Sequence, residues 1–351
     1  MTEDAGENRR SWLRRTAVGL AAASFGQLDA RKALLAERAR GDTQLTTREM
    51  PVSLGLPKQV NAGVLNVGYA DEGPVDGVPV ILLHGWPYDI HSFADVTPLL
   101  VDAGYRVIVP HLRGHGTTRF LSDATPRNAQ QSALAVDVVA LMDALGIRRA
   151  VLAGFDWGAR TAAVVAALWP ERCRALVSVS GYLIGNPAAN EMPLLPESEL
   201  EWWYQFYFAT ERGRAGYEKY TREFARLIWQ LDSPRWKFDD ATFDRSAASF
   251  DNPDHVNIVI HNYRWRLGLS PGEARFDVLE RRLATAPVIA VPTITLESDA
   301  NGAPHPSPNA YASKFVGTYA HRLVTGGIGH NLPQEAPRAF ADAVVAAGAL
   351  R

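Results

Sequence analysis

The sequence predicts an α/β fold in which a mostly parallel central sheet is flanked by helices and interrupted by a helical insertion. Short, continuous apolar runs alternate with segments of helical spacing up to residue 185 and again from residue 286 onward. Between these two parts, residues 186–285 are rich in aromatic and charged residues, and their apolar runs have helical spacing. Alternation of strands and helices is typical of a parallel sheet that carries helices on its faces.

The first predicted strands come directly before the first polar motif of the chain. Residues 64–70 alternate like a strand, and Asp71-Glu72-Gly73-Pro74 ends it. The runs 78–83 and 105–110 are continuously apolar, as expected for strands that are buried on both faces. A helix around residues 92–103 connects these two strands.

The next predicted element is a helix from Gln131 to Leu145, because its apolar residues recur every three or four positions. Gly146 stands where a C-terminal cap belongs. The remaining predicted core elements are strands at 150–154, 175–180, 288–296 and 322–324, and helices at 159–169 and 338–347.

The composition indicates an ordinary globular protein. The chain has 351 residues, of which 47% are hydrophobic and 21% charged, which is enough for one or two domains with a large core. A net charge of −2 gives no reason to expect a nucleic-acid partner. The single cysteine, Cys173, excludes an internal disulfide, and its place before an apolar run predicts a small buried residue.

The N-terminal segment resembles a twin-arginine export signal. Arg9 and Arg10 are adjacent and precede a short, mild apolar run over residues 16–25. This run is too short to cross a bilayer, so no stable membrane anchor is expected. We therefore assign residues 1–45 to a signal and linker, and we expect export to the periplasm or the outside of the cell. The rest divides into a core, 46–185 with 286–351, and a helical cap or lid, 186–285.

The stretch from Gly154 to Gly158 places an acidic residue between two glycines, where an apolar strand meets a helix. Glycine permits a sharp turn at this junction because it has no side chain to clash. Such a turn pushes Asp156 out of the sheet and into a pocket, where it can act as a carboxylate nucleophile. The structural alternative is an aspartate that caps the following helix.

Other polar residues follow the ends of other predicted strands. The motif His84-Gly85-Trp86-Pro87, the segment 297–301 and His330 each come directly after one. Parallel strands place their carboxyl ends at one edge of the sheet, which is where ligands bind in open α/β sheets. We therefore expect these residues to gather around Asp156.

With these motifs, in the chain order nucleophile, acid and histidine, residues from about 50 to the end resemble an α/β-hydrolase of the epoxide hydrolase and haloalkane dehalogenase branch. The resemblance implies that Asp156 attacks the substrate and that His330 deprotonates the water that hydrolyses the resulting ester. It also implies an oxyanion hole formed by the backbone N–H groups of Trp86 and Trp157.

Two cap segments resemble the lid-tyrosine segments of epoxide hydrolases: residues 204–208, Tyr-Gln-Phe-Tyr-Phe, and residues 262–264, Asn-Tyr-Arg. The resemblance implies that Tyr204 and Tyr263 hold the epoxide oxygen and supply a proton. Tyr207 competes with Tyr204 for the first of these roles. Four further residues are assigned to the substrate pocket: His84, Pro87, Trp203 and Tyr207.

The acid position departs from the family pattern. In the family the acid lies three residues past the small residue that ends its strand, and counting from Ser298 places Asn301 there. Asn301 then orients His330 as a neutral partner, or Asp299 or Glu297 serves from a shifted loop, or the chain is impaired in ester hydrolysis. We favour Asn301, with Asp299 as the substitute.

We expect an epoxide hydrolase that acts on a small apolar epoxide and needs no metal or organic cofactor. One alternative is a haloalkane or haloacetate dehalogenase that forms the same Asp156 ester from an organohalide. Arg160 matches an arginine of haloacetate dehalogenases, but Trp157 stands where those enzymes have an arginine directly after the nucleophile. The other alternative is a non-catalytic ligand-binding protein with this fold. The pair His111 and His115 lies in a glycine loop, which does not suit a helical zinc-binding pair.

Overall fold

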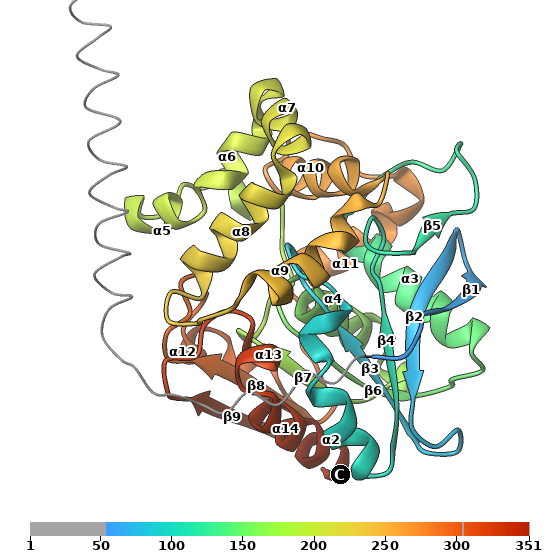
Figure 1. The fold of residues 1–351 in the computed structure, drawn as a ribbon. Helices are drawn as coiled ribbons and strands as arrows, with labels where there is room; N and C mark the ends of the chain where they lie inside the picture. The colour runs from blue at the N-terminus through green and yellow to red at the C-terminus, as the bar shows by residue number, and fades with distance from the viewer. Residues whose placement is uncertain (1–53, 304, 351) are drawn as a thin grey trace, which may run out of the picture. The chain divides into compact units, whose positions relative to one another are not determined.

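The computed structural model describes residues 54–303 and 305–350, and a mixed sheet of nine strands runs through this part of the chain (Figure 1). Neighbouring strands are parallel from β4 to β9, in the order β4-β3-β6-β7-β8-β9. Strand β2 pairs antiparallel with β1, β4 and β5. The strands are β1 (Lys58–Ala62), β2 (Leu65–Glu72), β3 (Val78–Leu83), β4 (Tyr105–Pro110), β5 (Arg119–Phe120), β6 (Ala150–Gly154), β7 (Cys173–Val179), β8 (Thr293–Ser298) and β9 (Tyr319–Val324).

Helices cover both faces of the sheet. On one face α3 (Gln131–Ala144) and α4 (Trp157–Leu168) pack on Ile81 and Leu83 of β3. On the other face α2 (Val96–Asp102) and α14 (Pro337–Ala349) pack on Val80 and Leu82. Successive residues of one strand therefore enter two different hydrophobic clusters, which explains why its sequence is continuously apolar.

The predicted core elements are present in the structure, but some of their bounds differ. Strand β2 continues through Asp71 and Glu72, which were expected to end it, and β9 begins at Tyr319. The helix expected at 92–103 is divided into a 3₁₀ turn, Ile90–Phe93, and α2. Strand β8 begins at Thr293 because Pro292 has no N–H to donate to the ladder, and Ile289 makes only an isolated bridge to Phe315. Strands β1 and β5 were not predicted. Cys173 is buried at the start of β7, as expected.

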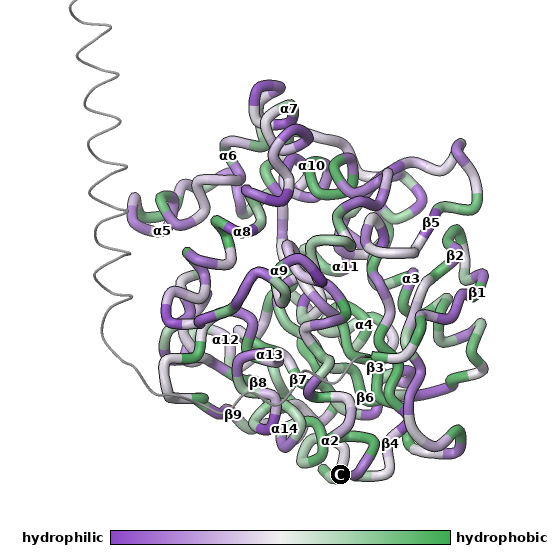
Figure 2. Tube along the Cα trace, viewed as in Figure 1, coloured by the Kyte–Doolittle hydropathy of each residue, from purple (hydrophilic) through white to green (hydrophobic). Residues whose placement is uncertain are grey.

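Seven α-helices lie between β7 and β8, and we call residues 186–285 the cap. These helices are α5 (Pro196–Glu201), α6 (Trp203–Ala209), α7 (Glu211–Lys219), α8 (Thr221–Asp232), α9 (Asp240–Ala247), α10 (His255–Arg266) and α11 (Asp277–Ala284). Helices α6 to α10 lie together, and the strands of the sheet lie on one side of this group (Figure 1). Hydrophobic residues concentrate on the central strands and α4, whereas α7 carries many hydrophilic residues (Figure 2).

Shorter segments complete the fold. In the core they are α12 (Pro308–Tyr311), α13 (Leu332–Glu335) and the 3₁₀ turns Pro170–Arg172 and Ala312–Lys314, and in the cap they are the 3₁₀ turns Ala189–Glu191, Ala248–Asp251 and Ala274–Phe276. Within the described residues, no helix combines the length and the hydropathy needed to span a bilayer. The segment that resembles an export signal lies outside the described residues.

Candidate active site

Asp156 occupies a strained turn between β6 and α4. Its backbone has φ 51° and ψ −123°, a conformation that non-glycine residues rarely adopt. The turn is tight enough that a Cβ at Gly158 would lie 1.8 Å from the carbonyl oxygen of Leu83. Asp156 does not cap α4 with its side chain. The strain therefore holds the carboxylate outside the sheet, where it is available for chemistry.

The two oxygens of Asp156 face different partners. The backbone N–H of Trp86 donates to Oδ1 over 2.8 Å, and the backbone amide of Trp157 also stabilises the ionised carboxylate. Oδ2 lies 3.7 Å from Nε2 of His330. Gly85 allows this approach, since a Cβ there would lie 2.4 Å from the Cβ of Asp156. The Trp86 amide thus binds one oxygen of Asp156, and the other oxygen faces His330.

His330 is oriented by Asn301. Nδ1 of His330 lies 3.2 Å from Oδ1 of Asn301, and this oxygen only accepts, so Nδ1 carries the proton. The Asn301 amide nitrogen lies 3.4 Å from the hydroxyl of Ser180. The structure therefore places Asn301 where the family has its acid, and Nε2 of His330 is directed at Asp156.

The remaining acid candidates lie elsewhere. The Asp299 carboxylate accepts hydrogen bonds from the backbone N–H groups of Gly326, Gly327 and Ile328, which explains why it does not reach His330. Glu297 accepts a hydrogen bond from the Tyr311 hydroxyl and pairs with His305. The structure does not bring Asp299 or Glu297 to His330.

Electrostatics link the nucleophile and the base. Burial alone would raise the pKa of Asp156, but the facing His330, the charge of Arg160 and the amide of Trp157 hold it below its ordinary value. Burial alone would lower the pKa of His330, but the carboxylates of Asp156, Asp232 and Glu335 raise it. The resting site therefore favours the ionised form of Asp156 and the protonated form of His330.

Asp232, at the C-terminal end of α8, is a site residue that the sequence analysis missed. Its backbone carbonyl accepts hydrogen bonds from the N–H groups of Gly302 and His330, at 2.8 and 3.2 Å. Its buried carboxylate makes no hydrogen bond to any described side chain and lies near the charges of His330 and Asp156. Burial, together with the charge of Asp156, raises the pKa of Asp232 to about 7.

The neighbouring Ser233 connects the cap to the loop that contains His330. Its hydroxyl accepts from the backbone N–H of His330 at 2.9 Å and donates to the Glu335 carboxylate at 2.7 Å. The only sequence signal for this contact is the end of a helix at Asp232-Ser233-Pro234. The end of a helix does not identify the residue that it contacts, because Ser233 and His330 are about a hundred residues apart in the chain.

Tyr204 of α6 and Tyr263 of α10 meet at the ring of Trp86. Their rings lie 5.3 Å apart, and each packs on the ring of Trp86, at 5.3 and 5.1 Å. Burial, reinforced by the charge of Asp156, raises the pKa of both phenols, so both keep their protons. The structure thus brings the rings of both predicted phenols to Trp86 of the motif His84-Gly85-Trp86-Pro87, which we call the oxyanion segment.

Tyr207 and Trp203 do not reach this position. Tyr207 stacks on Phe224, and its hydroxyl lies against Gly216, within the cap. Trp203 packs on Phe224 and touches the ring of Tyr204 only from the side, with centroids 6.2 Å apart. Tyr207 is therefore not placed to compete with Tyr204. Trp203 packs against the ring of Tyr204.

His84 and Pro87 stand on either side of Gly85 and Trp86, and both make hydrogen bonds that hold the surrounding structure. His84 is fully buried, its Nε2 accepts from the N–H of Leu112, and its Nδ1 faces the carbonyl of Gly85. Burial lowers the pKa of His84 to about 3, so its ring is neutral. Pro87 follows a cis peptide bond, and its carbonyl accepts from the Trp229 indole. Both ring nitrogens of His84 are thus engaged with backbone, and the residue has a structural role.

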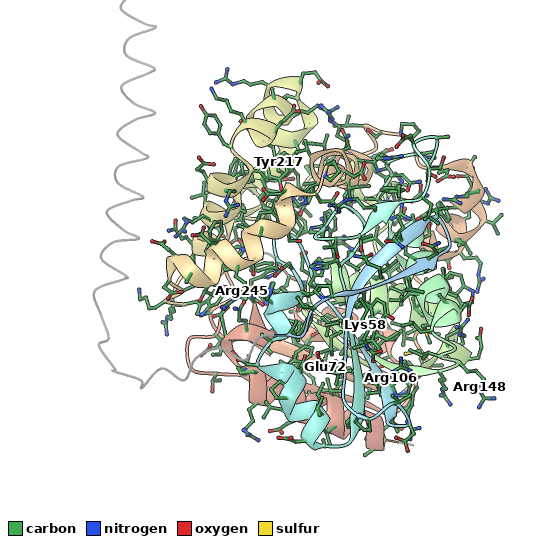
Figure 3. All side chains as sticks on the ribbon, turned by 45° about the vertical axis from the view of Figure 1, so that its right-hand side comes forward. Lys58, Glu72, Arg106, Arg148, Tyr217 and Arg245 are labelled. Atoms are coloured by element: carbon green, nitrogen blue, oxygen red, sulfur yellow. The ribbon has the colours of Figure 1, made fainter. Side chains whose placement is uncertain are left out.

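A chain of hydrogen bonds from the cap positions Trp86. The Gly114 carbonyl can only accept, so Nδ1 of His255 carries the proton and Nε2 accepts from the Tyr217 hydroxyl. Tyr217 in turn accepts from the Trp86 indole at 2.8 Å. Tyr217, labelled in Figure 3, lies on α7 of the cap. The sequence analysis did not identify Tyr217 or His255, because neither belongs to a local motif.

The other predicted histidines lie in the loop after β4. His111 and His115 are buried, and burial lowers the pKa of each to about 4. His115 packs on His84 and His255, with ring centroids 4.9 and 4.8 Å apart. In the part of the chain that the structure describes, no group of His, Cys, Asp or Glu residues is arranged to hold a metal ion.

Comparisons with known proteins agree with the fold. Residues 78–227 match the family described as the alpha/beta hydrolase fold. A solved structure of a candidate epoxide hydrolase from Klebsiella pneumoniae superposes with a TM-score of 0.84 and 62% identity, covering 86% of this chain and 100% of that one. The chain therefore belongs to the α/β-hydrolase fold family.

Curated relatives match a shorter stretch. Epoxide hydrolase B of Mycobacterium tuberculosis is 36% identical over 157 residues, which cover 41% of this chain and 44% of the relative. A haloalkane dehalogenase of Mycolicibacterium paratuberculosis is 36% identical over 120 residues, 34% of this chain and 39% of that protein. The matched stretch thus spans less than half of the length of these relatives.

Proposed function

We propose that the protein hydrolyses epoxides to diols through an ester on Asp156. The observation that carries the proposal is that the two carboxylate oxygens of Asp156 have different partners. Oδ1 accepts a hydrogen bond from the Trp86 amide, and Oδ2 faces His330. Two protonated phenols, Tyr204 and Tyr263, stand at the same oxyanion segment. A carboxylate nucleophile, a base and two oxygen ligands are what the two half-reactions require.

In the first half-reaction, Oδ2 of Asp156 attacks a ring carbon of the epoxide. The new C–O bond displaces the epoxide oxygen, which leaves with its electron pair and takes a proton from Tyr204 or Tyr263. Hydrogen bonds from buried phenols stabilise the charge that develops on this oxygen. The products are a β-hydroxyalkyl ester on Asp156 and a phenolate that regains its proton from water.

Ester formation switches His330 into a base. The Asp156 carboxylate is one of the charges that raise the pKa of His330, and an ester carries no charge. The pKa of His330 therefore falls once the ester forms, and the ring loses its proton. In its neutral form it can accept a proton from an attacking water at Nε2.

In the second half-reaction, this water adds to the ester carbonyl. The negative charge appears on Oδ1 and is held by the amides of Trp86 and Trp157. Collapse breaks the bond between the carbonyl carbon and the alkyl oxygen, which takes the proton from His330. The diol leaves, and Asp156 retains one oxygen atom from water.

The decisive experiment is a single turnover in water labelled with oxygen-18, with enzyme in excess over an epoxide. The label is expected in the Asp156 carboxylate, as read by mass spectrometry of the peptide that contains it, while the first diol formed is unlabelled. Label in the diol and none in Asp156 would mean that water attacks the epoxide directly and would reject the ester mechanism.

A dehalogenase is the second candidate, favoured by one observation. The buried indole Nε1 of Trp157 makes no close hydrogen bond to the described residues and lies near the Tyr263 hydroxyl, whereas that of Trp86 is occupied by Tyr217. An indole N–H beside the nucleophile that is not held by a close acceptor suits a leaving halide. Release of halide from a panel of haloalkanes, with no diol from epoxides, would replace the first proposal by this one.

We also propose that the protein is exported through its N-terminal segment. The support is the pair Arg9 and Arg10 ahead of a short apolar run. Replacing both arginines by lysine is expected to retain the protein in the cytoplasm, as measured by cell fractionation. Unchanged export of the double variant would reject the proposal.

A further inference from the structure

Two arginines from different parts of the chain line one small cavity. Arg160 comes from α4 of the core, and Arg266 ends α10 of the cap. The cavity has a volume of about 190 Å³, and its wall also includes Gln131, Asn190 and Trp202. No aspartate or glutamate is among the described residues that line it.

Neither guanidinium has a carboxylate partner. Arg160 donates from Nε to the carbonyl of Leu183, and Arg266 lies over the rings of Trp202 and Tyr263, at 5.3 and 5.6 Å. Among the described residues, neither forms an ion pair. Burial, together with the charge of Arg266, lowers the pKa of Arg160 to about 10. Two like charges beside one cavity repel each other, and an anion between them would relieve the repulsion.

The cavity adjoins the reacting groups. Arg160 lies in the first turn of α4, with its N–H bonded to the Asp156 carbonyl at 3.0 Å. Arg266 contacts the ring of Tyr263, one of the phenols at the oxyanion segment. Residues four apart on a helix have Cβ atoms about 6 Å apart, so a group bound at Arg160 is about one helical turn from the nucleophile.

The wall of the cavity is held in place by hydrogen bonds. Asn190 donates to the backbone carbonyl of Arg266 at 2.8 Å, and Gln131 donates to the carbonyl of Gly185 at 2.8 Å. The carbonyl of Leu183, which also lines the cavity, accepts from Nε of Arg160 at 3.0 Å. The two guanidinium groups therefore need little rearrangement on binding, which lowers the entropic cost of holding an anion.

We propose that this cavity binds the carboxylate of the substrate, and that the enzyme acts on epoxides that carry a carboxylate group a few bonds from the ring. The inference rests on the proposed function and specifies its substrate class. A guanidinium fork matches a planar carboxylate with two parallel hydrogen bonds. Two such forks on one cavity select a charged, planar end group over a neutral one of the same shape.

The first test compares an epoxide carboxylate with its primary amide, which has the same shape and no charge. The native enzyme is expected to prefer the carboxylate, and Arg266→Gln is expected to lower the ratio of the two kcat/KM values by about 10- to 100-fold. Arg160→Gln should act in the same direction. Arg282→Gln, at an exposed arginine on α11, is the matched control and should leave the ratio unchanged.

The second test measures binding without turnover, by calorimetry with butanoate. Binding that weakens by about tenfold in Arg266→Gln and not in Arg282→Gln would support the subsite. Inorganic phosphate that binds more tightly than butanoate would overturn the assignment to a carboxylate.

The two tests separate this inference from the proposed function. Diol formation from neutral epoxides, without a carboxylate preference and without arginine-dependent binding, overturns the subsite and leaves the activity intact. Arginine-dependent butanoate binding without diol from any epoxide supports the subsite and rejects the activity.

Discussion

The nucleophile and its base are built in different ways. Asp156 and its two oxyanion donors belong to two adjacent strand ends of the core, β3 and β6. His330 also follows a core strand, but its backbone N–H is bound by Ser233 of the cap, and its charge is influenced by Asp232. The nucleophile thus depends on local backbone geometry, whereas the base depends on how the cap docks.

This difference explains which parts of the site can be predicted. The turn at Asp156 is visible in the sequence because Gly154 and Gly158 lie within two residues of it, and the requirement for glycine is local. His330 and Asn301 are found by their places after strands. Asp232, Arg266 and Tyr217 are not, because their partners His330, Arg160 and Trp86 lie about a hundred to a hundred and thirty positions away in the chain.

The largest expected effect is on the nucleophile side. Asp156→Asn removes the attacking oxygen and is expected to lower kcat by about 10⁴-fold or more, with no covalent adduct. Intact-protein mass spectrometry and diol formation measure this together. Asp143→Asn, at an exposed aspartate paired with Arg172, is the control and should retain full activity. Residual turnover within about tenfold of the native rate would show that Asp156 is not the nucleophile.

The next largest effect separates the two sides. His330→Gln leaves Asp156 able to attack but removes the base, so the ester accumulates and steady-state turnover falls by about 10²- to 10⁴-fold. Mixing the variant with one equivalent of epoxide should give the adduct mass in full. An adduct-free variant with equally slow turnover would mean that His330 acts before ester formation.

The two half-reactions are expected to differ in their dependence on pH. The pKa of Asp156 is held below its ordinary value, so ester formation should stay constant from about pH 5 to about pH 8. Hydrolysis needs neutral His330, so its rate should rise with pH over the same interval. Rapid-quench measurement of both phases gives the two profiles, and a flat profile for hydrolysis would contradict the role of His330.

A negative charge introduced beside His330 is expected to have a smaller effect on turnover. Asn301→Asp supplies the charge that the native residue lacks, and is expected to accelerate ester hydrolysis by about 3- to 10-fold, because it stabilises the imidazolium. Ester formation, measured in the same experiment, should not change. An unchanged hydrolytic rate would mean that Asn301 does not act as the partner of His330.

The smallest expected effect concerns Asp232 of the cap. The pKa of Asp232 is raised in the folded state, so its carboxyl group loses its proton at a lower pH in the unfolded chain than in the folded protein. Folding stability therefore falls as pH rises from about 4 to about 7. Asp232→Asn removes this loss and should raise the free energy of unfolding by about 1–3 kcal/mol at pH 8, with no gain near pH 4. The same substitution should slow ester hydrolysis by about 2- to 5-fold. Equal gains at both pH values, measured by denaturant unfolding, would contradict an ionised Asp232.

The double attachment of Trp86 has a mechanical consequence. Its amide stabilises the charged oxygen of Asp156, while its indole is tied through Tyr217 and His255 to two helices of the cap. An outward swing of α7 and α10 would pull on the same residue that completes the oxyanion hole. The position of the cap and the geometry of the oxyanion hole are therefore coupled through Trp86.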